Sequence, residues 1–205
     1  MEKSKPQLPT PSDLQRRRGR WKLMLIVAVC AAPMIASYFT YYVIKPESRT
    51  NYGELLDPRQ YPIPPLGMTT LDGKPVKLQD YQGKWVLLQV GGGDCNQSCK
   101  EHLFAMRQLR LMQGKDMERM ERVWLITDAQ PLDTMLMREY DGTDMLRVDS
   151  KLLQAWLPVE AGGSAADHLY MIDPRGNLMM RFPKGADPNR VKKDIGKLLR
   201  ASSIG

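Results

Sequence analysis

Cys95 and Cys99 are the residues best suited to carry chemistry, and they stand four positions apart in the segment Cys95-Asn96-Gln97-Ser98-Cys99. The chain has one further cysteine, Cys30, in an apolar run. One close pair and one remote cysteine do not make a framework of structural disulfides. The pair therefore indicates either thiol-disulfide chemistry or binding of a soft metal ion, most obviously Cu(I).

The sequence around the pair predicts a strand that ends in a loop and leads into a helix. Residues 84–90 are an apolar run, glycines 91–93 end it, and residues 96–113 have helical periodicity. The N-terminus of a helix favours thiolate over thiol. Residues four apart in a regular helix have Cβ atoms about 5–6 Å apart, whereas a disulfide needs about 3.5–4.5 Å. The pair can therefore close only if Cys95 lies in the loop.

An inert, purely structural disulfide is the alternative interpretation of the pair. It is poorly motivated, because the stabilisation from a cross-link grows with the length of the loop it closes, and this loop is short. For exchange chemistry we expect Cys95, the more exposed sulfur by position, to attack and Cys99 to resolve the mixed disulfide.

The segments that must position the pair alternate between strands and helices, which predicts an α/β sheet ending in an antiparallel hairpin. Glycines 91–93 are not followed by a Lys-Ser/Thr pair, so a nucleotide-binding loop is not expected. The predicted elements are a hairpin over 68–78 around Asp72-Gly73, a strand over 122–127, a helix over 132–140, a strand over 146–149, a helix over 150–156 capped by Ser150, a hairpin of 168–172 with 178–182, and a helix over 187–200 capped by Asp187.

The N-terminal part predicts a membrane anchor. Residues 23–44 contain no charged side chain, and a helix of that length spans about 33 Å, enough for a hydrocarbon core of about 30 Å. Residues 1–22 form a basic tail without expected regular structure, residues 45–65 a Pro-rich linker, and residues 66–205 the folded domain. A cleaved signal peptide is the rival interpretation, although the apolar stretch is longer than a usual signal core.

The charge distribution indicates membrane orientation and argues against nucleic acid as a partner. The net charge is +7, and residues 1–22 hold seven Lys/Arg against two Asp/Glu. A basic cluster before the span predicts a cytoplasmic N-terminus. The chain is therefore expected to be a single-pass protein of the inner (cytoplasmic) membrane, with its C-terminal domain in the periplasm.

Two segments of the folded part resemble the SCO/SenC family. The first is Asp72-Gly73-Lys74 with Leu78 and Gly83-Lys84-Trp85-Val86-Leu87-Leu88 ahead of the CxxxC pair, and the second is the run 169–178, Leu-Tyr-Met-Ile-Asp-Pro-Arg-Gly-Asn-Leu. The resemblance covers residues 66–199. It implies a thioredoxin-like domain, a mixed sheet flanked by helices, behind one N-terminal transmembrane helix.

The resemblance also implies a function and a copper site. Family members help to assemble the copper centre of cytochrome c oxidase, so this chain would deliver Cu(I) or exchange disulfides at that site. Its partner would be an oxidase subunit or another copper-site assembly protein. Cys95 and Cys99 would be the redox residues and two of the copper ligands, with His168 as the best third ligand. The alternative function is that of a general periplasmic thiol-disulfide oxidoreductase or a thiol peroxidase.

This sequence departs from the family pattern at two positions. Lys100 stands where the family has a proline after the second cysteine, and His168 lies three residues later than the family's copper-binding histidine, which would fall near Ala165. His168 would either still reach the site or make an ordinary hydrogen bond in a strand. His102, one turn beyond Cys99, is the other candidate ligand, unless it is a surface residue of the helix.

Overall fold

The computed structural model describes residues 11–44 and 51–204. The chain divides into two units, Met1–Arg49 and Thr50–Gly205, which are treated separately. Residues 1–10 of the predicted basic tail and residues 45–50 of the predicted linker lie outside the described residues.

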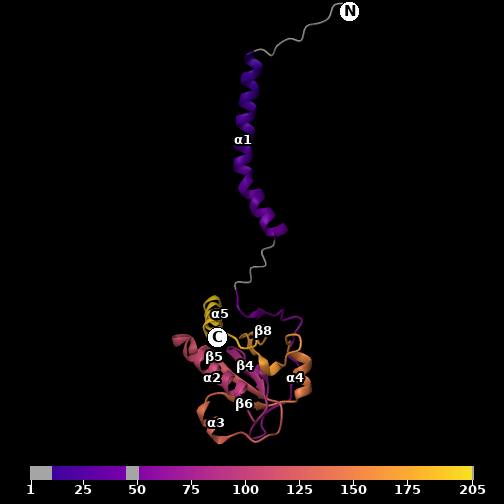
Figure 1. Ribbon diagram of the computed structural model, residues 1–205, viewed down its shortest axis with the longest axis vertical. Coiled ribbons are helices and arrows are strands. Elements are labelled where there is room, and N and C mark those ends of the chain that lie inside the picture. The colour runs from indigo at the N-terminus through magenta and orange to yellow at the C-terminus, as the bar shows by residue number, and fades with distance from the viewer. Residues whose placement is uncertain (1–10, 45–50, 205) are drawn as a thin grey trace, which may run out of the picture. The chain divides into compact units, whose positions relative to one another are not determined.

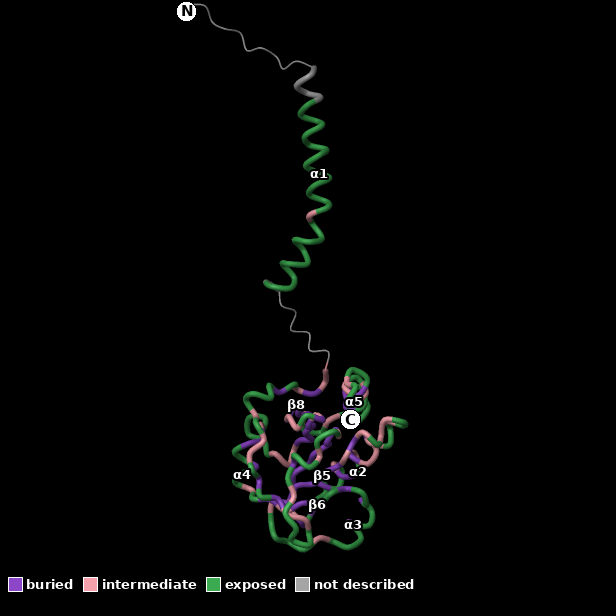
Figure 2. Tube along the Cα trace, turned by 180° about the vertical axis from the view of Figure 1, so that it is seen from behind, coloured by how far each residue is buried: buried purple, intermediate pink, exposed green. Residues whose placement is uncertain are grey.

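The first unit contains one long helix, α1 (Pro11–Phe39), followed by a π-helical turn over Thr40–Ile44 (Figure 1). Within Arg16–Tyr42, an 18-residue window has a mean hydropathy of 2.0, and the helix is long and apolar enough to cross a membrane. Its residues are exposed almost throughout (Figure 2). The helix begins earlier than expected, because residues 11–22, predicted to lack regular structure, are helical. Their Leu, Gln and Arg residues are good helix formers.

The second unit is built on one mixed eight-stranded sheet with the order β1-β8-β7-β4-β5-β6-β2-β3. Strands β4, β5 and β6 run parallel, and the other neighbouring pairs are antiparallel. The strands are Glu54–Leu55 (β1), Met68–Thr70 (β2), Pro75–Val76 (β3), Trp85–Gly91 (β4), Met120–Ile126 (β5), Asp144–Arg147 (β6), Leu169–Ile172 (β7) and Leu178–Arg181 (β8).

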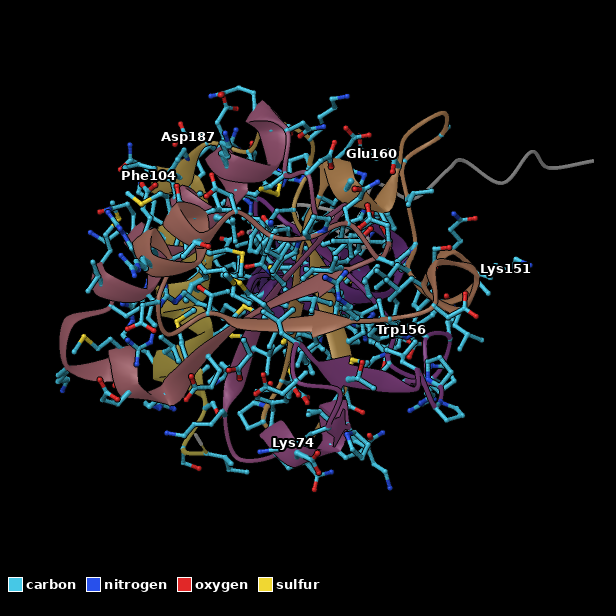
Figure 3. The ribbon with its side chains drawn as sticks, turned by 90° about the horizontal axis from the view of Figure 1, so that it is seen from below. Lys74, Phe104, Lys151, Trp156, Glu160 and Asp187 are labelled. Atoms are coloured by element: carbon cyan, nitrogen blue, oxygen red, sulfur yellow. A yellow bond between two sulfur atoms is a disulfide. The ribbon has the colours of Figure 1, made fainter. Side chains whose placement is uncertain are left out.

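Helices cover both faces of this sheet, which is the arrangement of a thioredoxin-like fold. Helix α4 packs on one face, and α2, α3 and α5 pack on the other. Figure 3 shows the two sides, with Phe104 of α2 and Asp187 before α5 on one and Lys151 and Trp156 of α4 on the other. The helices are Gln97–Leu111 (α2), Thr134–Glu139 (α3), Ser150–Trp156 (α4) and Pro188–Ala201 (α5).

Strand β4 lies in the centre of the sheet, and all seven of its residues are buried. Alternate side chains of a strand point to opposite faces, so Val86, Leu88 and Val90 enter the core under α4. Trp85 and Leu87 enter the core on the α2 face. The same alternation places the side chain of Gln89 on the α2 face, in a strand that is otherwise apolar.

The predicted linker over residues 45–65 is too long, because the chain joins the folded domain well before residue 66. Strand β1 pairs with β8 at the edge of the sheet. The backbone N–H groups of Tyr52 and Gly53 both donate to the carboxylate of Asp194 on α5, over 2.6 and 2.9 Å. Asp194 is 2% exposed, and a buried carboxylate needs such partners. These two hydrogen bonds therefore attach the start of the domain, at Tyr52 and Gly53, to helix α5.

The predicted elements of the domain all exist, with shifts of a few residues at their ends. Asp187 caps α5 as expected, accepting from the backbone N–H of Asn189. The cap predicted at Ser150 is wrong, because the carboxylate of Asp149 accepts from the N–H of Lys151 and Ser150 is the first helical residue. Aspartate and serine are both common caps, and the sequence offered the two side by side.

Candidate functional site

Cys95 and Cys99 form a disulfide at the junction between β4 and α2, with their Cα atoms 5.1 Å apart. Cys95 lies in the loop, as the spacing of the pair required. Its φ is +37°, a region that residues other than glycine rarely adopt. Its N–H donates to the carbonyl of Gly92 over 3.2 Å. The loop therefore makes the bend that lets Cys95 meet a cysteine on the helix.

Cys99 lies in the first turn of α2. The side chain of Asn96 caps the helix and accepts from the N–H of Cys99 over 3.0 Å. The unpaired N–H groups and the helix dipole give this end of α2 a partial positive charge. A sulfur held there is stabilised when it becomes a thiolate.

Both cysteines are buried, which corrects the expectation that Cys95 is the more exposed. Cys95 is 2% exposed and Cys99 is 7% exposed. They pack with Leu103, Trp124 and Ile126 in the core between α2, α3 and the sheet. An incoming thiol can therefore reach either sulfur only when the loop before α2 moves.

The loop before Cys95 is held by Asp128, which follows β5. The N–H of Gly93 donates to both carboxylate oxygens of Asp128, over 2.9 and 3.1 Å. A Cβ at Gly92 would lie 2.6 Å from one of those oxygens, and a Cβ at Gly93 would lie 2.6 Å from the carbonyl of Gln130. The glycines therefore serve close packing of the loop against residues 128–130.

Two buried polar side chains lie beside Cys99 on the α2 face of the sheet. The side-chain amide of Gln89 donates from Nε2 to Cys99 Sγ over 3.3 Å. Trp124 is the partner of Gln89 in the pairing of β4 with β5. Gln89 and Trp124 are both fully buried. Within the described part of the chain, Oε1 of Gln89 and Nε1 of Trp124 have no hydrogen-bond partner.

His168 does not join the cysteines. It is 1% exposed, and its Nδ1 lies 2.9 Å from the carbonyl oxygen of Phe182. A carbonyl only accepts, so Nδ1 carries the proton and donates. The other ring nitrogen, Nε2, accepts from the N–H of Glu160 over 3.5 Å. His168 thus makes ordinary hydrogen bonds at the start of β7.

His102 lies on α2, one turn after Cys99, and it is less exposed than a surface residue of the helix would be. Its Nδ1 is buried without a hydrogen-bond partner in the described structure. Burial lowers the pKa of His102 below its ordinary value, with the neighbouring Glu101 opposing and His168 adding to the shift. The imidazole is therefore held in its neutral form.

The expected copper ligands are not gathered around one point. Over residues 11–44 and 51–204, no group of three His, Cys, Asp or Glu side chains is placed to hold a metal ion. Cys95 and Cys99 are brought together, but in a disulfide, and His168 has both nitrogens engaged elsewhere. The residues present do not fit the three-ligand copper site that the family resemblance implied.

The fold and the disulfide define the class as a thioredoxin-like domain carried behind an apolar N-terminal helix. Residues 85–202 match the family described as the transmembrane-like, thioredoxin-like, C-terminal domain, and residues 13–43 match its transmembrane-like N-terminal domain. The first match covers more than half of the chain. The protein therefore belongs to this transmembrane-like, thioredoxin-like family.

Solved structures of low identity share the fold. Yeast Sco1 with copper bound is 12% identical, with 76% of this chain and 96% of that chain covered and a TM-score of 0.53. The thioredoxin domain of a thiol-disulfide oxidoreductase from Bacteroides vulgatus is 18% identical, with coverage of 67% and 94% and a TM-score of 0.51. BsSco, a member of the Sco family of cytochrome c oxidase assembly proteins, is 14% identical, with coverage of 69% and 95% and a TM-score of 0.51. A comparison with curated proteins found no match.

Sequence analysis found the cysteines but missed the residues around them. Gln89 was hidden in a run assigned to the strand as a whole, although one amide in an otherwise apolar strand is a usable signal. Trp124 looked like core, and its link to Gln89 depends on the register of two strands. Asp128 follows the next strand, so its contact with the glycine loop depends on the parallel pairing of β4 with β5.

Proposed function

We propose that this protein is a membrane-anchored thiol-disulfide exchange factor that acts on the cysteines of a copper site, as an assembly factor for cytochrome c oxidase. The observation that carries the proposal is the Cys95–Cys99 disulfide at the N-terminus of α2, with Gln89 donating to Cys99 Sγ. A disulfide that closes so short a loop adds little stability. Its placement at a helix N-terminus suits redox chemistry instead.

The exchange needs only the two cysteines of this chain and a client disulfide. In the reduced protein, the thiolate of Cys95 attacks one client sulfur, and the client's S–S bond breaks to give a mixed disulfide and a client thiolate. The thiolate of Cys99 then attacks Cys95 Sγ, releases the second client thiolate and forms the Cys95–Cys99 disulfide. The client gains two electrons, and a dithiol reductant of the same compartment returns the protein to its reduced form.

The client is proposed from the relatives and from the anchor. BsSco belongs to a family of oxidase assembly proteins, and its fold is shared here. A single span at the N-terminus would hold the domain beside a membrane-embedded oxidase subunit and raise the local concentration of the pair. We place the N-terminus in the cytoplasm and the domain in the periplasm, because the basic cluster precedes the span.

Cu(I) delivery is the finer alternative suggested by the copper-bound relatives, and the residues of this chain support it less. A thiol role requires only the pair of sulfurs, whereas the expected third ligand His168 is engaged with Phe182 and Glu160. An anaerobic Cu(I) titration of the reduced full-length protein against a competing chelator separates the two. We expect His168→Asn to bind Cu(I) no more weakly than the wild type does, and a clear loss of affinity would revive the copper site.

The proposed function is tested in cells that lack the protein and depend on it for oxidase assembly. Cells are complemented with the wild type, with the double variant Cys95→Ser, Cys99→Ser, or with His168→Asn as the control. We expect the double variant alone to fail, and the client's copper-site cysteines to resist thiol alkylation because they remain in a disulfide. A membrane-permeant dithiol should rescue it and excess copper should not. Full oxidase activity with the double variant would overturn the proposal.

A general oxidoreductase or a thiol peroxidase would give other outcomes in simpler assays. A peroxidase would consume peroxide with the purified reduced protein, and a general oxidoreductase would reduce unrelated disulfide proteins as fast as a peptide carrying the client's two cysteines. We expect preference for the copper-site peptide and no peroxide turnover above that of the double cysteine variant.

A further inference from the structure

We propose that Gln89 and Trp124 are positioning residues that stabilise the thiolate of Cys99 and thereby make Cys99 the leaving sulfur when the disulfide opens. The inference rests on the proposed exchange function and deepens it, because it fixes which sulfur forms the mixed disulfide. It starts from the polar atoms beside the disulfide that the fold itself does not use.

Gln89 supplies the direct contact. Its amide group donates from Nε2 to Cys99 Sγ over 3.3 Å and is fully buried in the central strand. A disulfide sulfur is a weak acceptor, whereas a thiolate carries a full charge and accepts much stronger, charge-assisted hydrogen bonds. The same amide is therefore more strongly bonded after reduction than before it.

Trp124 supplies a second donor close to the same sulfur. A Cβ built at Gly91 would lie 3.4 Å from Nε1 of Trp124 and 3.6 Å from Cys99 Sγ. The indole nitrogen and the sulfur therefore lie within 7.0 Å of each other, since both are close to one point. The absence of a side chain at Gly91 leaves the space between them open. Rotation of the freed Cys99 side chain can then bring its thiolate toward the indole N–H.

The unpaired indole N–H of Trp124 indicates which redox state of Cys99 the site suits. In the described disulfide form, the donor Nε1 of Trp124 is buried without a partner. Oε1 of Gln89 is also unpaired, but it is an acceptor and cannot bond a thiolate. A buried polar group without a partner is unfavourable, and phenylalanine and leucine would fill similar volumes without that penalty. The pocket therefore has hydrogen-bonding capacity that the disulfide leaves unused and that a negatively charged sulfur can use.

The consequence for the reaction is that one sulfur of the disulfide is attacked and the other leaves. An incoming thiolate attacks Cys95 Sγ, the bond between Cys95 and Cys99 breaks, and its electron pair stays on Cys99 Sγ, which becomes a thiolate. No proton is needed in this step. A leaving sulfur with a lower pKa leaves faster. Donors at Cys99, together with the start of α2, thus place the mixed disulfide on Cys95.

The experiment measures the redox equilibrium and the pKa of the Cys99 thiol in full-length protein in detergent, in a Cys30→Ser background. The redox equilibrium is set with mixtures of reduced and oxidised glutathione and followed by alkylation and mass. The pKa is measured from thiolate absorbance with Cys95→Ser added. The variants are Gln89→Leu and Trp124→Phe. Trp85→Phe is the matched control, because Nε1 of Trp85 is also buried without a partner in the described structure, but at the far end of β4.

We expect Gln89→Leu to shift the equilibrium about tenfold toward the disulfide, about 30 mV more negative, and to raise the Cys99 pKa by about one unit. Trp124→Phe should move both in the same direction by a smaller factor, and Trp85→Phe should move neither. Unchanged pKa and potential in a folded Gln89→Leu protein would overturn the inference. A wild-type disulfide that never equilibrates with glutathione would instead overturn the proposed function, while the pKa of Cys99 would still decide the inference.

Discussion

The polar residues beside Cys99 and the residue His168 belong to neighbouring parts of the sheet. The two regions differ in whether their buried polar atoms are hydrogen-bonded. Gln89 of β4 pairs with Leu169 of β7, the residue after His168. Both His168 nitrogens have backbone partners. Beside Cys99, by contrast, one Gln89 oxygen and one Trp124 nitrogen are unpaired in the described structure. Both ring nitrogens of His168 are therefore hydrogen-bonded, whereas the described region beside Cys99 contains buried polar atoms without partners.

This difference separates a histidine whose hydrogen bonds are complete from a cysteine site with a donor to spare. Buried polar groups in proteins are hydrogen-bonded with few exceptions, and the exceptions need an explanation. His168 needs none, since its bonds join the start of β7 to the residue that follows β8. The unsatisfied indole N–H of Trp124 beside Cys99 is explained if the thiolate form of the cysteine accepts from it. The predictions below test the two regions against each other.

The largest effect is expected from the cysteines themselves. With oxidised glutathione, reduced Cys99→Ser should collect one glutathione on Cys95, because no second thiol removes it. Reduced Cys95→Ser should react far more slowly, since the donors that stabilise the Cys99 thiolate lower its nucleophilicity. Intact mass over time measures both rates, with Cys30→Ser in every protein. Equal rates for the two variants would contradict the assignment of roles.

His168→Ala should reduce the stability of the protein without changing its redox chemistry. The variant leaves the Phe182 carbonyl without its donor and opens a cavity, which we expect to lower the free energy of unfolding by about 2–4 kcal/mol. His168→Asn is the matched control, because its side-chain amide can still donate to that carbonyl. Denaturant unfolding measures the stability of each protein. A shift in the redox potential of either folded variant would show that the two regions are not separate.

Gly91→Ala should give a smaller change on the cysteine side. The new methyl group would make ordinary contacts of 3.4 Å with Trp124 Nε1 and 3.6 Å with Cys99 Sγ, so the fold should tolerate it. It would stand between the indole donor and the sulfur, and we expect the pKa of the Cys99 thiol to rise by a few tenths of a unit. Thiolate absorbance measures that pKa. An unchanged pKa would mean that the indole does not act on Cys99.

His102 should give the smallest effect, a dependence of stability on pH. Burial lowers its pKa in the folded protein below the ordinary value, which is about 6.5 in the unfolded chain. As the pH falls through that value the unfolded chain takes up a proton and the folded chain does not, so stability decreases. Unfolding at about pH 7.5 and about pH 5.5, compared between wild type and His102→Gln, should show a weaker decrease in the variant. An equal decrease would mean that His102 titrates normally.

Sequence patterns predicted the α/β sheet because its strands are apolar runs and its helices are periodic, and the family resemblance implied its thioredoxin-like arrangement. The pair of Cys95 and Cys99 was also found from a local pattern, since the two cysteines stand only four positions apart in the sequence. Strand β1 was missed because two residues carry no pattern, and its pairing with β8 is a tertiary contact. The prediction that Cys95 is the more exposed sulfur was wrong, because burial depends on how α2 and α3 pack over the loop. No local pattern contains that packing.

The reduction potential of the wild-type disulfide tests the central claim most directly. Full-length protein in detergent is equilibrated with glutathione mixtures, and the fraction of free thiols at Cys95 and Cys99 is counted by alkylation and mass. A redox-active pair should have a potential between about −120 and about −270 mV, the range of known thiol-disulfide oxidoreductases. A potential below about −300 mV, typical of structural disulfides, would contradict the account.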